Sequence, residues 1–218
     1  MRELIINYKA YEEGVDGAIS IAKTASDIAA KHRVRIMVSP PLSVLSQVSD
    51  KCESLAQRMD AIDPGAFTGH ISWYEVKKAG GIGVLINHSE NKVDYKTMKT
   101  LVELCKSHSL KSYVCCANMT EAKAVIRLNP TAIAYEPPSL IGGKISVSAA
   151  KPGIVKEFTD LVKNGSSSLA LIGAGIKKGE DVSKSVELGS DGILVASGIM
   201  KSRDYKNAIE GLAVPLED

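Results

Sequence analysis

Short apolar runs recur along the chain at near-regular intervals, and amphipathic stretches separate them. The runs that we predict to be strands cover residues 4–7, 35–39, 59–62, 83–87, 112–117, 132–136, 168–173 and 192–197. They are apolar almost throughout rather than alternating, as is typical of parallel strands that are covered on both faces. Between them, helical periodicity marks stretches such as residues 18–32, 97–109, 120–129 and 180–189. Repeated strand–helix units of roughly 27 residues predict an α/β fold, specifically a (β/α)8 barrel.

An open, doubly wound sheet is the alternative fold. The best candidate for a dinucleotide-binding fingerprint is GAGIKK, which has Gly173 and Gly175 but places Lys178 where the third glycine is needed. No linker, low-complexity segment or shift in composition divides the chain. We therefore expect residues 1–218 to form one barrel domain. Residues of helix-capping type precede several helical stretches, and we expect Asp16, Asp94 and Thr120 to be N-caps.

Charge and composition exclude several classes of protein. The net charge of +2 gives no sign of a nucleic-acid partner. No apolar run approaches the ~20 residues that a membrane helix needs, and MRELIINYKA lacks the features of a signal peptide. The four cysteines, Cys52, Cys105, Cys115 and Cys116, show neither metal-binding spacing nor a disulfide framework. We interpret them as buried free thiols of a cytoplasmic protein.

Polar side chains follow several predicted strands. Asn7 and Lys9 follow the first, His88 follows the fourth together with Ser89 and Glu90, and Glu136 ends the sixth. Taken alone, Glu136 could be a solvated acid, His88 a structural histidine and Lys9 an exposed lysine. In a barrel, however, the carboxyl ends of all strands share one face, where active sites lie. We therefore predict a site in which these side chains meet.

The turns after the seventh and eighth strands have the composition of an anion site. Both GAGIKKGED and ASGIMKSRD leave a strand through small residues, which allow backbone N–H groups to approach an anion. Capped tight turns without a ligand are the alternative. After Glu136, the two prolines 137 and 138, the apolar tip 139–141 and the two glycines 142 and 143 suggest a hinged lid.

These residues resemble the triosephosphate isomerase family over the whole chain. The motifs that carry the resemblance, all in family order, are NYK (7–9), GAFTGH (65–70), LINHSE (85–90), AYEPP (134–138), LIGAGI (171–176) and ASG (196–198). The compact length, AYEPPSLIG and GAGI are most similar to the short archaeal branch.

The resemblance implies a role for each matching residue. It makes Glu136 the general base and His88 the electrophile, and it makes Asn7 and Lys9 substrate-binding catalytic residues. The residues that it implies in phosphate binding are Asn7, Lys9, Ile141, Gly142, Gly175, Ala196 and Ser197. We expect Ser89 to cap a helix after His88 with Glu90 in its first turn, so that the positive helix end favours a neutral imidazole.

Two segments depart from the family pattern. Gly143 and Lys144 stand where a threonine and a glycine are usual, and Lys144 could reach the anion itself. The loop before DPGAFTGH is short, which could alter a subunit interface. Because Phe67 at the tip of the 64–71 loop is one of two phenylalanines, we expect that loop to dock into another chain of a homo-oligomer, either a dimer or a tetramer.

The expected reaction is the interconversion of dihydroxyacetone phosphate and D-glyceraldehyde 3-phosphate through an enediolate. We expect neither a cofactor nor a metal, and no nucleic-acid or membrane partner. The alternatives are another sugar-phosphate barrel, such as an epimerase with a metal held by histidines and acids, and an inactive barrel that only binds phosphate. The single strand-end histidine, His88, argues against the epimerase.

Overall fold

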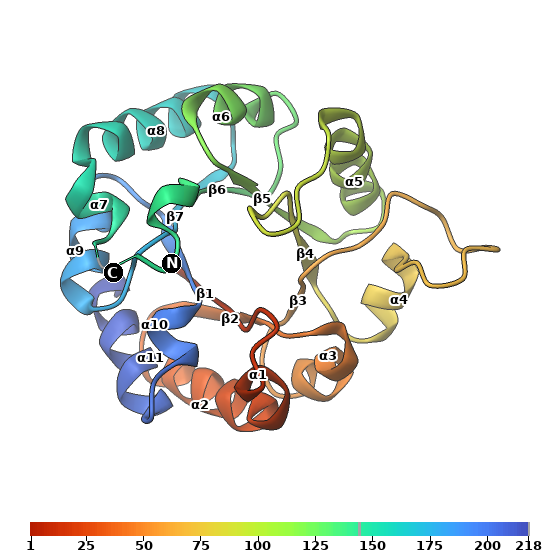
Figure 1. The fold of residues 1–218 in the computed structure, drawn as a ribbon, viewed down its shortest axis with the longest axis horizontal. Coiled ribbons are helices and arrows are strands. Elements are labelled where there is room, and N and C mark those ends of the chain that lie inside the picture. The colour runs from red at the N-terminus through yellow and green to blue at the C-terminus, as the bar shows by residue number, and fades with distance from the viewer. Residues whose placement is uncertain (144, 218) are drawn as a thin grey trace.

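Eight parallel strands form a nearly closed barrel in the computed structural model, which describes residues 1–143 and 145–217 (Figure 1). The strands are β1 (Glu3–Asn7), β2 (Arg35–Ser39), β3 (Leu55–Ala56), β4 (Gly83–Ile86), β5 (Lys111–Cys116), β6 (Ala132–Tyr135), β7 (Leu169–Ile172) and β8 (Gly192–Val195). Their order is β2-β1-β8-β7-β6-β5-β4-β3. A single parallel bridge between Val38 and Ser54 joins the two ends of this order. The predicted (β/α)8 barrel is confirmed.

Helices cover the outside of the ring (Figure 1). They are α1 (Glu13–Asp16), α2 (Ala18–Lys31), α3 (Leu42–Ser49), α4 (Trp73–Lys78), α5 (Tyr95–Ser107), α6 (Met119–Ile126), α7 (Val147–Ala150), α8 (Pro152–Gly165), α9 (Gly179–Glu187), α10 (Ser197–Met200) and α11 (Tyr205–Ala213), with short 3₁₀ turns at Pro138–Leu140 and Val214–Leu216. Of the helices in the described part of the chain, none combines the length and the apolarity needed to cross a membrane.

Alternation along the strands divides the core into two shells. Ile5 belongs to a small cluster inside the barrel, whereas Leu4 and Ile6 belong to the larger cluster between strands and helices. Because side chains two residues apart share a face, Glu3, Ile5 and Asn7 lie at the floor, the middle and the mouth of the interior. The same period carries β6 from Ala134, inside, to Glu136 at the mouth.

The third strand differs from its prediction. The structure places it at Leu55–Ala56, where Leu55 pairs with Gly83, and not at residues 59–62. Asp60 instead makes two hydrogen bonds with the backbone of Ile71, which is far along the chain. These bonds hold together the two ends of the long loop between residues 60 and 71. The apolar residues at 59–62 therefore belong to the start of this loop and not to a strand.

Helix starts are confirmed in one of three cases. Asp94 caps α5 by accepting a hydrogen bond from the backbone N–H of Thr97. Asp16 belongs to α1 and does not cap α2. Thr120 lies inside α6, where Asn118 is the capping residue. In α6 the side chain of Asn118, two residues earlier, makes the capping hydrogen bond with the N–H of Glu121, and α2 begins after Gly17 without a side-chain cap.

Candidate active site

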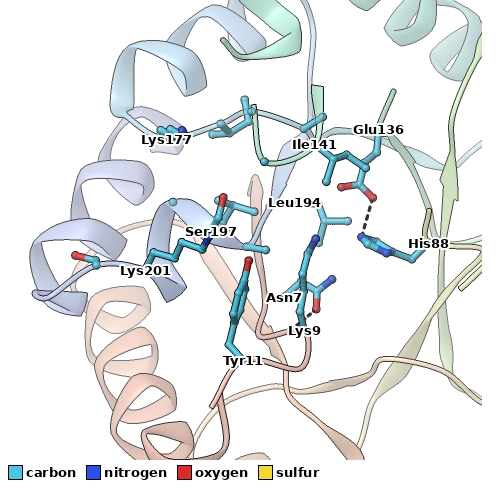
Figure 2. A pocket seen from close by; sticks show the side chains of 18 residues that line it. Asn7, Lys9, Tyr11, His88, Glu136, Ile141, Lys177, Leu194, Ser197 and Lys201 are labelled. Carbon is cyan, nitrogen blue, oxygen red and sulfur yellow. Dashed lines mark hydrogen bonds and ion pairs between the residues drawn. The ribbon is translucent and has the colours of Figure 1, made fainter. Parts of the chain in front are cut away.

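A cavity of about 420 Å³ opens at the carboxyl ends of the strands. It is lined by Asn7, Lys9, Tyr11, His88, Glu136, Ile141, Gly142, Ala174, Gly175, Ile176, Lys177, Leu194, Val195, Ala196, Ser197, Gly198, Lys201 and Ser202. All the residues predicted from sequence to be catalytic or phosphate-binding are among them. Glu90 lines a smaller neighbouring pocket with Lys9 and His88. Figure 2 shows Glu136 and His88 on one side of the cavity and Ser197 on the other.

The backbone after β1 is held in an unusual conformation. Lys9 has a φ of 50°, in the left-handed region that non-glycine residues rarely adopt. Its N–H donates to Oδ1 of Asn7 at 2.9 Å, and its carbonyl accepts from Nε2 of Gln57 at 2.8 Å. These bonds compensate for the strained backbone. The Lys9 ammonium then lies 2.6 Å from Oε1 of Glu90.

His88 lies in a turn whose hydrogen bonds select a tautomer. The backbone N–H of Glu90 donates to Nδ1 of His88 at 3.2 Å. Nδ1 is therefore an acceptor, and a neutral ring carries its proton on Nε2. The Nε2 atom lies 3.6 Å from Oε2 of Glu136 and is thus directed at the cavity.

The expected helix directly after His88 is not there. Residues 89–91 form a turn, and α5 starts only at Tyr95. The prediction that Ser89 caps a helix, with Glu90 in its first turn, was therefore wrong. The tautomer of His88 depends instead on the single N–H of Glu90.

Glu136 is buried without a full set of partners. Its residue is 6% exposed, and Oε2 has no hydrogen-bond partner among residues 1–143 and 145–217. Burial raises the pKa of Glu136 above its usual value, although the hydrogen bond from the Cys115 thiol and the charge of Lys9 act in the opposite direction. A carboxylate in this state is a better base than one in water.

Gly173 makes room for Glu136, which the sequence analysis missed. A Cβ on Gly173 would lie 2.5 Å from Cγ of Glu136 and 2.6 Å from Oε1. The position follows Leu171 by two residues and so faces the barrel interior. That alternation was the available signal, but the glycine was considered only for its turn.

The turns after β7 and β8 pack against each other and against the backbone at Ile145. Gly175 has a φ of 74°, and a Cβ there would lie 2.3 Å from the carbonyl oxygen of Ile145. A Cβ on Gly198 would lie 2.8 Å from the carbonyl oxygen of Ile176. The small residues are thus needed for close backbone packing. Ala196 precedes α10, which Ser197 begins.

The segment after Glu136 forms a compact turn at the edge of the cavity. Residues Pro138–Leu140 are a 3₁₀ turn, and Ile141 and Gly142 line the cavity. The predicted contact of Lys144 with the anion lies outside the described residues. The lining residues to which sequence reasoning assigned no role include Tyr11, Lys177 and Lys201.

Metal ligation has no visible basis in the described residues, where no three His, Cys, Asp or Glu side chains are grouped to hold an ion. The arrangement supplies a buried carboxylate, an imidazole N–H and an ammonium that face one cavity. Together these groups can remove a proton beside a carbonyl and stabilise the resulting oxyanion.

Known proteins resemble this chain over nearly its full length. The model of the triosephosphate isomerase family matches residues 3–212. The triosephosphate isomerase of Caldivirga maquilingensis is 42% identical over 217 residues, covering 98% of this chain and 96% of the relative. That of Methanopyrus kandleri is 39% identical over 220 residues, with 98% and 97% covered. That of Methanosarcina acetivorans is 38% identical over 213 residues, with 96% of each chain covered.

Proposed function

This chain belongs to the triosephosphate isomerase family, and on that premise we propose how the residues of its barrel mouth carry out the family's reaction. The chain is an isomerase that interconverts dihydroxyacetone phosphate and D-glyceraldehyde 3-phosphate, a step of glycolysis and gluconeogenesis. The substrate is a small phosphate ester. The reaction moves one proton between adjacent carbons and a second between the oxygens that these carbons carry.

Glu136 is the base that moves this proton. Its carboxylate, which burial leaves poorly solvated, removes a proton from the carbon beside the carbonyl and returns it to the neighbouring carbon. General base catalysis of this kind contributes ~10²–10⁴-fold to the rate. The unpartnered Oε2, 3.6 Å from Nε2 of His88, is the observation that carries the proposal.

His88 and Lys9 stabilise the enediolate. The Nε2 proton of His88 and the ammonium of Lys9 face the cavity in which the oxygen becomes negative. This family is itself the standard example of a neutral imidazole used in this way, so the role is taken from the family. Asn7 orients Lys9 through the 2.9 Å bond to its backbone.

The turns at Gly175, Ala196 and Ser197 bind the phosphate, and the segment at Ile141 and Gly142 covers it. An enediolate can expel an adjacent phosphate by elimination. A cover that excludes water and fixes the phosphate suppresses that loss.

Solvent exchange tests the function directly. When the protein is incubated with dihydroxyacetone phosphate in heavy water, we expect D-glyceraldehyde 3-phosphate that carries deuterium beside the carbonyl. A chelator should leave the rate unchanged. A rate abolished by chelation would instead favour the metal-dependent epimerase, and a protein that binds inorganic phosphate without any exchange would be the inactive barrel.

We also propose a homo-oligomer that assembles through the 64–71 loop. The segment projects away from the barrel beyond α4 (right of Figure 1), and its Phe67 is 47% exposed. A second hollow lies along this loop and the start of α4. Such an exposed aromatic tip is typical of a docking element. Replacing Phe67 by Asp should lower the mass measured by sedimentation equilibrium, whereas an unchanged mass would exclude the loop as the interface.

We place the protein in the cytoplasm. All four cysteines are buried and unpaired, which suits a reducing compartment. The glycolytic role points the same way. Fluorescence of a tagged copy in living cells would test the compartment, and signal confined to the cell envelope would contradict it.

A further inference from the structure

The cavity holds more positive charge than the reaction itself requires. Among the described residues that line it, Lys9, Lys177 and Lys201 are cationic, and Glu136 is the acidic one. Only Lys9 has a role in the mechanism proposed above. The other two come from different elements, since Lys177 follows β7 and Lys201 follows α10. Both flank the turns that bind the phosphate.

Lys201 is held in place by an aromatic ring. Its Nζ lies 5.6 Å from the centroid of the Tyr11 ring, a cation–π distance. Figure 2 shows Lys201 beside Tyr11, on the side of the cavity where Ser197 lies. The ring of Tyr11 packs in turn against the outer core. The ring of Tyr11 thus supports the ammonium of Lys201 on the side of the cavity where Ser197 lies.

Neither extra lysine has an anionic partner within residues 1–143 and 145–217. Their neighbour Lys178, by contrast, pairs with Glu180 at 2.5 Å and does not line the cavity. The ion pair of Lys9 with Glu90, at 2.6 Å, already uses part of the charge of Lys9. Lys177 and Lys201 therefore carry the positive charge that remains uncommitted in the cavity.

The substrate creates a need for that charge. A phosphate monoester carries about two negative charges near neutral pH. It must enter a cavity that already contains the carboxylate of Glu136, with Glu90 beside Lys9. With Lys9 as the sole cation, the occupied site would carry a clear excess of negative charge. That excess would repel the ligand and disfavour the additional negative charge that forms on the enediolate.

We propose that Lys201 is a substrate-binding residue whose ammonium contacts the phosphate, positioned by Tyr11, and that Lys177 adds a longer-range attraction at the same flank. This assignment rests on the proposed function. It divides the work between two lysines: Lys9 serves the reacting end of the substrate and Lys201 its phosphate. It also gives Tyr11 a positioning role that involves no contact with the reacting atoms.

Binding of inorganic phosphate, measured by isothermal titration calorimetry, tests this without relying on catalysis. We expect K201Q to raise the Kd for phosphate about tenfold, the size typical of a lost charge-assisted hydrogen bond. K201R should restore most of the affinity, because it keeps both the charge and the stacking. Y11L should weaken binding about two- to fivefold, since it removes only the support.

Two further variants separate contact from long-range attraction. K177Q should raise the Kd about twofold at low salt and leave it unchanged at high salt, because a distant charge is screened. The matched control is K178Q, which removes a neighbouring lysine outside the cavity and should leave the Kd unchanged at both salt concentrations. Thermal unfolding should be equal for the four lysine variants and the unmodified protein, since each replaced lysine is exposed.

The proposal is overturned if K201Q binds phosphate as tightly as the unmodified protein, or if K178Q weakens binding equally. The KM for dihydroxyacetone phosphate should rise in parallel with the Kd, with kcat changing less. If phosphate binding depends on Lys201 but no isomerisation occurs, the phosphate assignment stands and the proposed reaction fails. If isomerisation is normal but phosphate binding does not depend on Lys201, the proposed reaction stands and the phosphate assignment fails.

Discussion

Glu3 and Glu136 are both buried inside the barrel, one at each end, and their surroundings differ. Glu3, 3% exposed, lies at the floor, where Tyr113 donates to its two oxygens at 3.3 and 3.1 Å and Arg35 donates at 3.3 Å. Glu136, 6% exposed, lies at the mouth, where Oε2 has no hydrogen-bond partner in the part of the chain that the structure describes. Burial raises the pKa of both carboxyls.

The two carboxylates differ in how many of their oxygens accept hydrogen bonds from the protein. At the floor, the hydrogen bonds of Tyr113 and Arg35 occupy the oxygens of Glu3, and Arg35 also binds both oxygens of Glu53. Both oxygens of that carboxylate thus accept hydrogen bonds from the protein, and the group contributes to cohesion. At the mouth, Oε2 of Glu136 is left without a hydrogen bond, and we propose that this oxygen takes the proton of the substrate. A buried carboxylate with an unpartnered oxygen costs stability. The position of this oxygen at the mouth is consistent with the catalytic role that we propose for Glu136.

The largest expected effect follows from neutralising each acid in turn. E136Q should lower kcat by ~10²–10⁴-fold, because it removes the base and keeps the shape. E3Q is the matched control and should keep kcat within about twofold, since the floor contacts no substrate. A coupled assay at saturating substrate measures both. Equal losses in the two variants would show that burial alone, and not the position at the mouth, explains the activity.

The room around Glu136 can be removed without touching the carboxylate. G173A places a Cβ 2.5 Å from Cγ of Glu136 and forces the side chain to move. We expect kcat to fall about 10–100-fold, since displacing a catalytic group by about 1 Å has this effect. G211A is the control, because a Cβ on that helical glycine meets nothing within 4 Å. If G173A retained full activity, the position of Glu136 would not depend on that space.

The smallest effect concerns pH. Because the pKa of Glu136 is raised in the folded protein, its ionised form is penalised there relative to the unfolded chain. The penalty is present above the folded pKa and disappears as pH falls through it. We expect E136Q to unfold with a higher free energy than the unmodified protein at neutral pH. This advantage should shrink on acidification.

Denaturant unfolding across pH measures that free energy. The same shift predicts that kcat/KM of the unmodified protein falls on acidification at a pH above 4.5, the usual glutamate value. An acid limb at or below this value would contradict the raised pKa.

The sequence was sufficient for the features set by periodicity and order. Apolar runs predicted seven strands within a few residues, and their ends brought Asn7, His88 and Glu136 to one face. It was insufficient where tertiary contacts decide. The pairing of Leu55 with β4 defines a third strand of two residues, too short to leave a pattern.

The cavity shows the same limit. Alternation along β7 places Gly173 inside the barrel, but the side chain that needs its space belongs to Glu136, just after β6 and far away in sequence. The ring of Tyr11 is likewise far from Lys201 in sequence. A lysine or a glycine is common on any surface or turn, so neither residue type signals such a neighbour. Local sequence carries no information about a contact that forms only when the ring closes.

The short third strand leaves the barrel with a seam. Five residue pairs join β1 to β2, but a single bridge, Val38 to Ser54, connects β2 to the β3 edge. The projecting 64–71 loop leaves the barrel just after this edge. A second subunit that binds this loop would therefore stabilise the part of the barrel where β2 and β3 are joined by a single bridge. We expect amide hydrogens near Ser54 to exchange fastest among the strands in dilute solution and to slow as subunits assemble. Equal exchange rates along all the strands would show that the seam is as stable as the rest of the barrel.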